Sequence, residues 1–177
     1  MRNVFKVIVG VFLLFFAFNS YNAYSGELKL GFVNYKKVFN SYEKTKDLRE
    51  KLKEKTNEKK LEAQKMIDDI NKLKNQMQIL SEDAKEEKRK ELKEKLRKFN
   101  DFSEDAKEEL LKESDKVYKQ LSKEIVNAIQ ELGKKGGYTF IFDSQTLFYK
   151  DNAYDLTDAV IKFLNDKYKK EKSKNSK

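Results

Sequence analysis

The chain has 177 residues, of which 39% are charged, and its formal net charge is +9. It contains no cysteine, histidine, proline or tryptophan. The lack of cysteine excludes a disulfide scaffold, and the lack of both cysteine and histidine excludes the usual zinc sites and the Ser–His and Cys–His nucleophile arrangements. Carboxylates are plentiful, but on charged helices they mostly form solvated faces. We therefore predict no catalytic residue, no metal site and no cofactor, and an enzyme is not expected.

The first 25 residues have the three parts of a secretory signal peptide. Arg2 and Lys6 are basic, residues 7–18 are apolar, and Ala23 to Ser25 provides small residues for a signal peptidase. We place the cleavage after Ser25, with Ala23 as the weaker choice. The alternative is an uncleaved membrane anchor, but an apolar helix of this length reaches only about 18 Å, short of the roughly 30 Å that a span needs. We expect export, which leaves a mature chain of +7 after the two basic residues are subtracted from +9.

A basic chain suggests acidic partners, namely nucleic acid, anionic lipid or an acidic protein. Export makes nucleic acid the least expected of the three. We therefore predict no binding of nucleic acid.

Residues 28–33 alternate in polarity and then end apolar, which is typical of a short strand with one buried face. Asn34 is a suitable N-cap for a following helix, in which Val38 and Phe39 share one side. A single short strand is not stable alone, so its partner must come from elsewhere in the chain or from another subunit.

Residues 32–132 contain neither glycine nor proline, which predicts very long helix. A heptad seam is formed by Met66, Ile70, Leu73, Met77 and Leu80. Ser81 is a good N-cap for a second helix, so we predict a helical hairpin with its tip near residues 78–83.

The alternative to the hairpin is one uninterrupted helix, and the charge pattern decides between them. Residues 44–60 carry a net +4, whereas residues 101–115 carry a net −5. A reversal at Ser81 lays these two blocks side by side. Single exposed pairs contribute only about 0.2–1 kcal/mol each, but a series of matching sign can select the antiparallel arrangement.

The return limb has a different apolar period. Phe99, Leu110, Leu121 and Leu132 lie eleven residues apart, a spacing that follows a straight or slightly right-handed path. On the outgoing limb the heptad seam extends backwards through Ala63, Lys59, Thr56 and Leu52, which are mostly polar. We expect apolar contacts at the base and tip of the hairpin and a polar middle.

The remainder of the chain is expected to complete a small body. Gly133 is the expected C-cap of the return helix. Residues 138–142 predict a strand, residues 143–145 a turn and residues 147–149 a second strand.

A final helix is expected to begin at Asp155–Asp158. Its predicted inward side chains are Leu156, Val160, Phe163 and Leu164. The lysine-rich residues 169–177 are expected to be disordered.

The sequence therefore predicts an α+β fold in which a long antiparallel helical hairpin, a coiled-coil-like arm, projects from a small β-containing oligomerisation body. Residues 26–41 and 117–168 form the body, residues 42–116 the arm and residues 169–177 a basic tail. The predicted oligomer or body core consists of Leu30, Phe32, Val33, Phe140, Ile141, Phe142, Leu147 and Phe148. Such apolar strands favour oligomerisation, and the alternative is a monomer covered by its own helices.

Four segments stand out in the chain, namely Leu30 to Phe39, the tip Leu80 to Asp83, Gly137–Tyr138 before a strand ending in Asp143, and Asp155 to Thr157. Together they resemble the Skp/OmpH family of periplasmic chaperones. The resemblance covers residues 28–168 in the family's order. It implies a periplasmic homotrimer with a central barrel-like body, whose three arms enclose unfolded outer-membrane proteins without ATP. The chain departs from many members in its longer tail, its arm rich in Lys and Glu, and its return helix without proline.

Within this resemblance, we predict that a basic face on the arm steers acidic clients inwards. The face consists of Lys85, Lys88, Arg89, Lys90, Lys93, Lys95, Arg97 and Lys98. A solubilising surface is the alternative for these residues. For the whole protein, the alternatives are a structural coiled-coil protein of the envelope and a protein that contacts anionic lipid or lipopolysaccharide.

Overall fold

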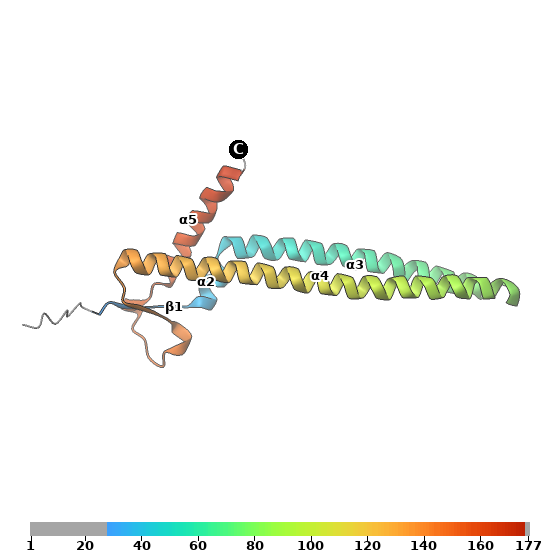
Figure 1. Cartoon of the computed structure of the whole chain (residues 1–177), viewed down its shortest axis with the longest axis horizontal. Coiled ribbons are helices and arrows are strands. Elements are labelled where there is room, and N and C mark those ends of the chain that lie inside the picture. Colours follow the sequence, from blue (N-terminus) through green and yellow to red (C-terminus); the bar gives the residue numbers. More distant parts are fainter. Residues whose placement is uncertain (1–27, 176–177) are drawn as a thin grey trace, which may run out of the picture.

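The structure, a computed structural model, describes residues 28–175, so the predicted signal peptide lies outside the described residues. In chain order the elements are β1 (Leu30–Val33), α2 (Tyr35–Ser41), α3 (Glu43–Met77), α4 (Glu82–Gly136), β2 (Phe140–Asp143), the 3₁₀ turns η1 (Ser144–Thr146) and η2 (Asn152–Tyr154), and α5 (Thr157–Asn175). Figure 1 shows α3 and α4 side by side, forming an arm that projects from the body at its base. The predicted α+β fold with a projecting antiparallel hairpin is confirmed.

The reversal of the hairpin occurs in residues 78–81, between the end of α3 at Met77 and the start of α4 at Glu82. Ser81 occupies the N-cap position, and its carbonyl accepts a hydrogen bond from the backbone N–H of Lys85 at 2.9 Å. Its side chain makes no capping hydrogen bond. Glu82 and Asp83 lie in the first turn, where negative charge is favourable.

The sheet of the described residues has two parallel strands, β1 and β2, with Leu30 opposite Phe140 and Val33 opposite Asp143. Phe32 is also bridged to Asp155. The partner that β1 requires is therefore supplied by the same chain. The connection between the two strands is the whole arm, so folding of the body brings together segments that are more than a hundred residues apart.

The end of α4 differs from the sequence prediction. The helix continues through Gly133 to Gly136, and Gly137 takes the left-handed conformation with a φ of 66°. The N–H of Tyr138 donates to the carbonyl of Gly133 at 2.9 Å, as in a Schellman motif. Gly133 is instead a buried residue within the helix. A Cβ at this position would lie 3.0 Å from Cδ1 of Ile141, so the lack of a side chain lets β2 approach α4.

The prediction of a strand at residues 147–149 is wrong. Leu147 only caps the turn η1, and the chain then bends towards η2. Phe148 and Tyr149 are exposed to solvent and pair with no strand among the described residues. Their β propensity is real, but a strand also needs a neighbour with free backbone groups.

The prediction of disorder from residue 169 is also wrong within the described part of the chain, because α5 continues to Asn175. Lysine is a good helix former, and Lys169 and Lys172 form ion pairs with the start of α3. The tail is therefore a helical extension held against the base of the arm.

The core of the body lies where β1, α2, the base of α4 and α5 meet. Its buried members are Val33, Val38, Tyr42, Leu121, Ile125, Ala128, Val160 and Leu164. The inward positions predicted for Val160 and Leu164 are confirmed, and Leu121 belongs to the eleven-residue pattern of the return limb. Burial of the large aliphatic members of this core, worth roughly 1.5–3 kcal/mol each, fixes the arm to the body.

Candidate functional site

The base of the arm is held at the break between α2 and α3. Tyr42 leaves helical geometry there, with φ −67° and ψ 120°, while α4 runs past the break without interruption. The buried Tyr42 hydroxyl donates to Oε2 of Glu124 at 2.9 Å, and Nζ of Lys44 lies 2.6 Å from Oε1. Burial and the hydrogen bond to Glu124 raise the pKa of Tyr42. The outgoing limb is thereby fixed to the return limb where the arm leaves the body.

The helix α5 holds the same region from the other side. Oδ2 of Asp47 accepts hydrogen bonds from the hydroxyl of Tyr168 and from Nζ of Lys172, both at 2.9 Å. The bonds from Lys172 and Tyr168 lower the pKa of Asp47. Lys169 is paired with Glu43 at 3.0 Å. The first turns of α3 are therefore in contact with both α4 and α5.

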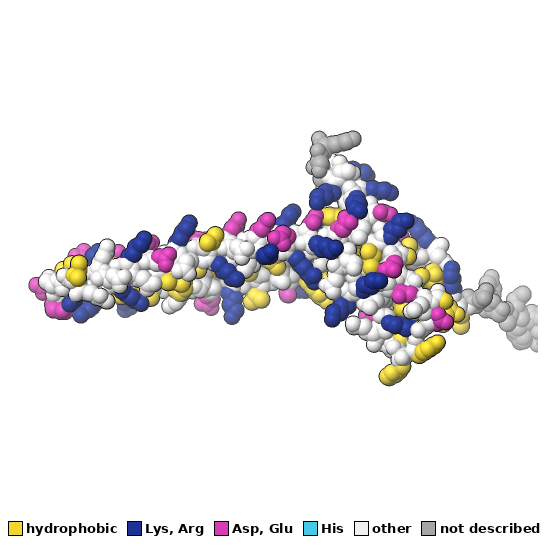
Figure 2. Space-filling model, turned by 180° about the vertical axis from the view of Figure 1, so that it is seen from behind, with side chains coloured by type: hydrophobic (Ala, Val, Ile, Leu, Met, Phe, Trp, Pro, Cys, Tyr) yellow, Lys and Arg dark blue, Asp and Glu magenta, His cyan; other side chains and the backbone are white. Residues whose placement is uncertain are grey.

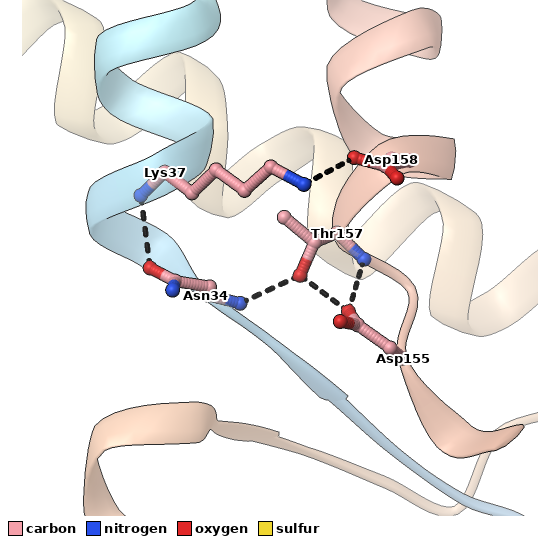
Figure 3. Close-up of polar contacts among 5 residues, drawn as sticks. All are labelled: Asn34, Lys37, Asp155, Thr157 and Asp158. Carbon is pink, nitrogen blue, oxygen red and sulfur yellow. Dashed lines mark hydrogen bonds and ion pairs between the residues drawn. The ribbon is translucent and has the colours of Figure 1, made fainter. Parts of the chain in front are cut away.

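A polar network joins the two ends of the body (Figure 3). The backbone N–H of Asn34 donates to Oγ1 of Thr157 at 2.9 Å, and the Asn34 side chain caps α2 by accepting from the N–H of Lys37 at 2.9 Å. The hydroxyl and the N–H of Thr157 both donate to Asp155. Lys37 is paired with Asp158 at 2.8 Å. These contacts connect the end of β1 to the start of α5.

The two oppositely charged blocks of the arm meet, as their sequences predict. Nζ of Lys55 lies 2.8 Å from Oε1 of Glu109 and 2.8 Å from Oε2 of Glu113, and Nζ of Lys59 lies 2.9 Å from Oε2 of Glu109. Hydrogen bonds from the two lysines lower the pKa of Glu109 to about 2. The pairs cross from α3 to α4, so they support the antiparallel register.

The predicted basic face lies on the distal half of α4, but much of its charge is compensated on the same helix. Ion pairs join Lys85 to Glu82, Lys88 to Glu91, Arg89 to Glu82 and Glu86, Arg97 to Glu94 and Asp101, and Lys98 to Glu94. Within residues 28–175, Lys90, Lys93 and Lys95 form no ion pair. These three lysines are therefore the members of the basic face whose charge is not held in an ion pair in the described part of the chain.

The residues predicted to form the oligomer or body core fall into two groups. Phe32 and Val33 are buried, and Ile141 and Leu147 are half-buried. Leu30, Phe140, Phe142 and Phe148 are exposed. The rings of Phe140 and Phe142 lie 6.1 Å apart on one face of β2, and Figure 2 shows hydrophobic side chains at the edge of the body, in yellow. Leu28, Tyr149 and Tyr154 add to the exposed apolar surface of the body.

Two features of the site could not be anticipated from the sequence. The packing of Tyr42 against Glu124 joins residues 82 positions apart without a motif to mark them. The contact of α5 with Asp47 was not predicted, because a lysine-rich chain end usually indicates disorder. By contrast, Leu121 was marked by the eleven-residue repeat.

Over residues 28–175 no group of acidic side chains is arranged to hold a metal ion. No helix in this part of the chain is both long enough and apolar enough to cross a membrane.

A small mixed body with a projecting helical hairpin defines a recognisable class of protein, and the comparisons agree. The family model described as outer membrane protein (OmpH-like) matches residues 29–164, so the chain belongs to the OmpH-like family. A solved structure of a candidate OmpH-like outer membrane chaperone from Caulobacter crescentus has the same fold, with a TM-score of 0.73 and 16% sequence identity, over 79% of this chain and 85% of that chain. A search of curated proteins found no match.

Proposed function

We propose that this protein is an ATP-independent holdase chaperone of the periplasm, which keeps unfolded outer-membrane proteins from aggregating in a cavity between arms. Membership in the OmpH-like family supports the proposal. Residues 26–41 and 117–168 serve as the body and residues 42–116 as the arm. The role requires no catalysis, cofactor or nucleic acid.

The observation that carries the proposal is the surface of the arm. Large apolar side chains are exposed along it at Leu61, Ile79, Leu96 and Leu111, each separated from the next by charged residues. Figure 2 shows such hydrophobic side chains, in yellow, scattered among basic and acidic ones. Isolated apolar contacts of this kind bind weakly and exchange quickly, but many of them acting together retain a flexible chain. A chaperone without an energy source needs both properties.

The exposed apolar side chains of the body support assembly into a homotrimer. Phe140, Phe142 and Phe148 present aromatic surface that a monomer would leave in water, and such patches usually mark interfaces. Association through the strand edge would also satisfy unpaired backbone groups of a two-stranded sheet. Three arms on a shared body would enclose the space in which a client is held.

The proposal is tested by light scattering after dilution of a urea-denatured outer-membrane β-barrel protein into buffer. The mature protein should suppress aggregation at a ratio near one assembly per client, with no nucleotide added. A matched control is the same chain with Leu61, Ile79, Leu96 and Leu111 replaced by glutamine, which should remain folded but suppress aggregation much less. Aggregation at the rate seen in buffer alone would contradict the proposal.

One observation favours a second role, contact with anionic lipid or lipopolysaccharide. Lys167, Lys170 and Lys174 are exposed on α5 and form no ion pair among the described residues. Each basic residue near an anionic surface contributes about 1 kcal/mol. Replacing Lys167, Lys170 and Lys174 by glutamine should weaken cosedimentation with anionic liposomes and leave chaperone activity unchanged. Equal cosedimentation of the original and substituted chains would exclude this role.

A further inference from the structure

The middle of the arm contains an apolar groove of about 400 Å³ between α3 and α4. Its uncharged lining includes Thr56 and Ala63 from α3 and Phe102, Ala106, Leu110 and Leu111 from α4. The groove is lined by residues of α3 and α4 in the arm, whereas the exposed Phe140, Phe142 and Phe148 of the body lie on β2 and in the loop after it. It is therefore separate from the surface proposed for assembly.

The groove forms because the two limbs are mismatched at this level. The α4 limb supplies large apolar side chains, whereas the extended heptad seam of α3 supplies Thr56 and Ala63, which are too small to fill the space. The hydroxyl of Thr56 donates to the carbonyl of Leu52 at 2.7 Å and so is turned back onto its own helix. Closer to the tip, Ile70 and Leu73 are buried and fill the space between the two limbs.

The charged side chains that line the groove are all basic, although acidic residues lie close by on α4. The charged residues that line it are Lys59, Lys60 and Lys107. Lys59 is already paired with Glu109 and lies 5.6 Å from the ring centre of Phe102. Lys60 and Lys107 form no ion pair with any described residue. An occupant that is apolar in the middle and acidic beside it would complement this lining.

We propose that this groove is a discrete client-binding site that takes an aromatic or large aliphatic side chain of an unfolded protein, flanked in sequence by acidic residues. The inference rests on the proposed chaperone function and assigns part of the binding to one place on the arm. The apolar side chain lies against Phe102, Ala106 and Leu111. Carboxylates one or two residues away in the client reach Lys60 and Lys107. Such sites would give a client preferred positions along the arm without tight binding.

The arm offers a matched pair of positions for the test. Leu111 lines the groove and is 60% exposed, and Leu61 is 64% exposed but does not line it. A photo-crosslinking amino acid is placed at one or the other position in the full mature protein. The probes are two unstructured synthetic peptides of equal length, each with one phenylalanine, flanked by glutamates in one and by lysines in the other.

We expect the acidic peptide to crosslink at least about fivefold more at position 111 than at position 61. The basic peptide should crosslink little at either position. Lys107→Glu should reduce the yield at position 111 several-fold. Lys116→Glu should leave the yield unchanged, because Lys116 is an exposed lysine of the same helix that forms no ion pair within residues 28–175. Lys107→Gln gives a second measure should the charge reversal disturb the arm, and it should cause a smaller loss.

Equal yields at positions 111 and 61, or equal yields for the two peptides, would overturn the proposal. Crosslinking of position 111 mainly to a second copy of this chain would also overturn it, because the groove would then be an interface between arms. The chaperone function itself is judged separately, by suppression of aggregation in the unmodified protein. If crosslinking shows no preference for the groove but the unmodified protein still suppresses aggregation, the dispersed apolar contacts of the arm account for all of the client binding.

Discussion

Thr157 is the residue through which the two ends of the body are most directly joined. It is 1% exposed, and its hydroxyl accepts from the N–H of Asn34 and donates to Asp155. Thr157→Val keeps the shape but leaves the Asn34 N–H without its partner. We expect the free energy of unfolding to fall by about 1–3 kcal/mol, the cost of an unsatisfied buried group.

The measurement is urea denaturation at a fixed protein concentration. Thr157→Ser is the control, since it keeps the hydroxyl and should lose less stability than the valine variant. A valine variant as stable as the original chain would show that the network contributes nothing.

Thr45 poses the opposite case. It lies at the base of α3, fully buried, and its hydroxyl is the one buried side-chain polar atom without a hydrogen-bond partner in residues 28–175. Thr45→Val removes the cost of burying this group and retains its volume, so it should raise the free energy of unfolding by about 1 kcal/mol. Thermal denaturation measures the change. A loss of stability would mean that the hydroxyl is satisfied in solution.

At the scale of single residues, local rules predicted positions well and contacts less well. Asn34 caps α2 as expected because the N-cap geometry depends on a few neighbouring residues. Ser81 stands at its predicted N-cap position, yet its side chain makes no capping bond. The partnership of Tyr42 with Glu124 depends on how two distant segments pack, so no local rule could provide it.

The arm as an element should be sensitive to acid through Glu109. Its pKa is lowered to about 2 by Lys55 and Lys59, whereas an unfolded glutamate titrates near pH ~4.3. A carboxyl with a depressed pKa contributes stability above its unfolded pKa and loses it as the pH falls through the folded value. Contact between the limbs should therefore weaken from about pH 5 down to about pH 2.

Circular dichroism of the helical arm against pH, combined with thermal melting, measures this effect. Glu109→Gln should melt earlier at neutral pH and show a shallower loss in acid. Glu104→Gln, at an exposed residue of the same helix that forms no ion pair in the described structure, should follow the original curve. The interpretation fails if Glu109→Gln has the same acid profile as the unchanged protein.

The elements show where sequence patterns are sufficient. The hairpin was predictable because its charge blocks and the N-cap at Ser81 are local or near-periodic features, and the cross-limb pairs of Lys55 and Lys59 follow from them. The strand predicted at residues 147–149 is absent from the structure, because strand formation depends on a neighbouring strand that the local sequence does not reveal. The C-cap of α4 is Gly137 and not the predicted Gly133. Gly133 lies inside the helix, where it packs against Ile141, and this contact between distant segments has no local sequence signal.

For the whole molecule, the three basic-face lysines without ion pairs should guide acidic clients towards the arm. Reversing Lys90, Lys93 and Lys95 to glutamate should reduce the rate of client capture several-fold at low salt and flatten its salt dependence, because exposed charges act over about one Debye length. Stopped-flow fluorescence with a labelled, urea-denatured barrel protein measures both quantities.

The matched control reverses Lys162, Lys167 and Lys170 on α5, which changes the net charge equally at another place and should leave the salt response of capture in place. Equal losses in the two variants would mean that only net charge matters. If neither variant captures the client more slowly, the basic face serves only to keep the protein soluble.

The central claim is that a small body with exposed apolar strands must assemble, and that the assembly holds a client between thin arms. Sedimentation of the mature protein, with and without a urea-denatured outer-membrane β-barrel protein, tests both parts at once. We predict three copies of the chain without client and one client bound to one such assembly. A single elongated chain that sediments unchanged while the barrel protein pellets alone would contradict the claim.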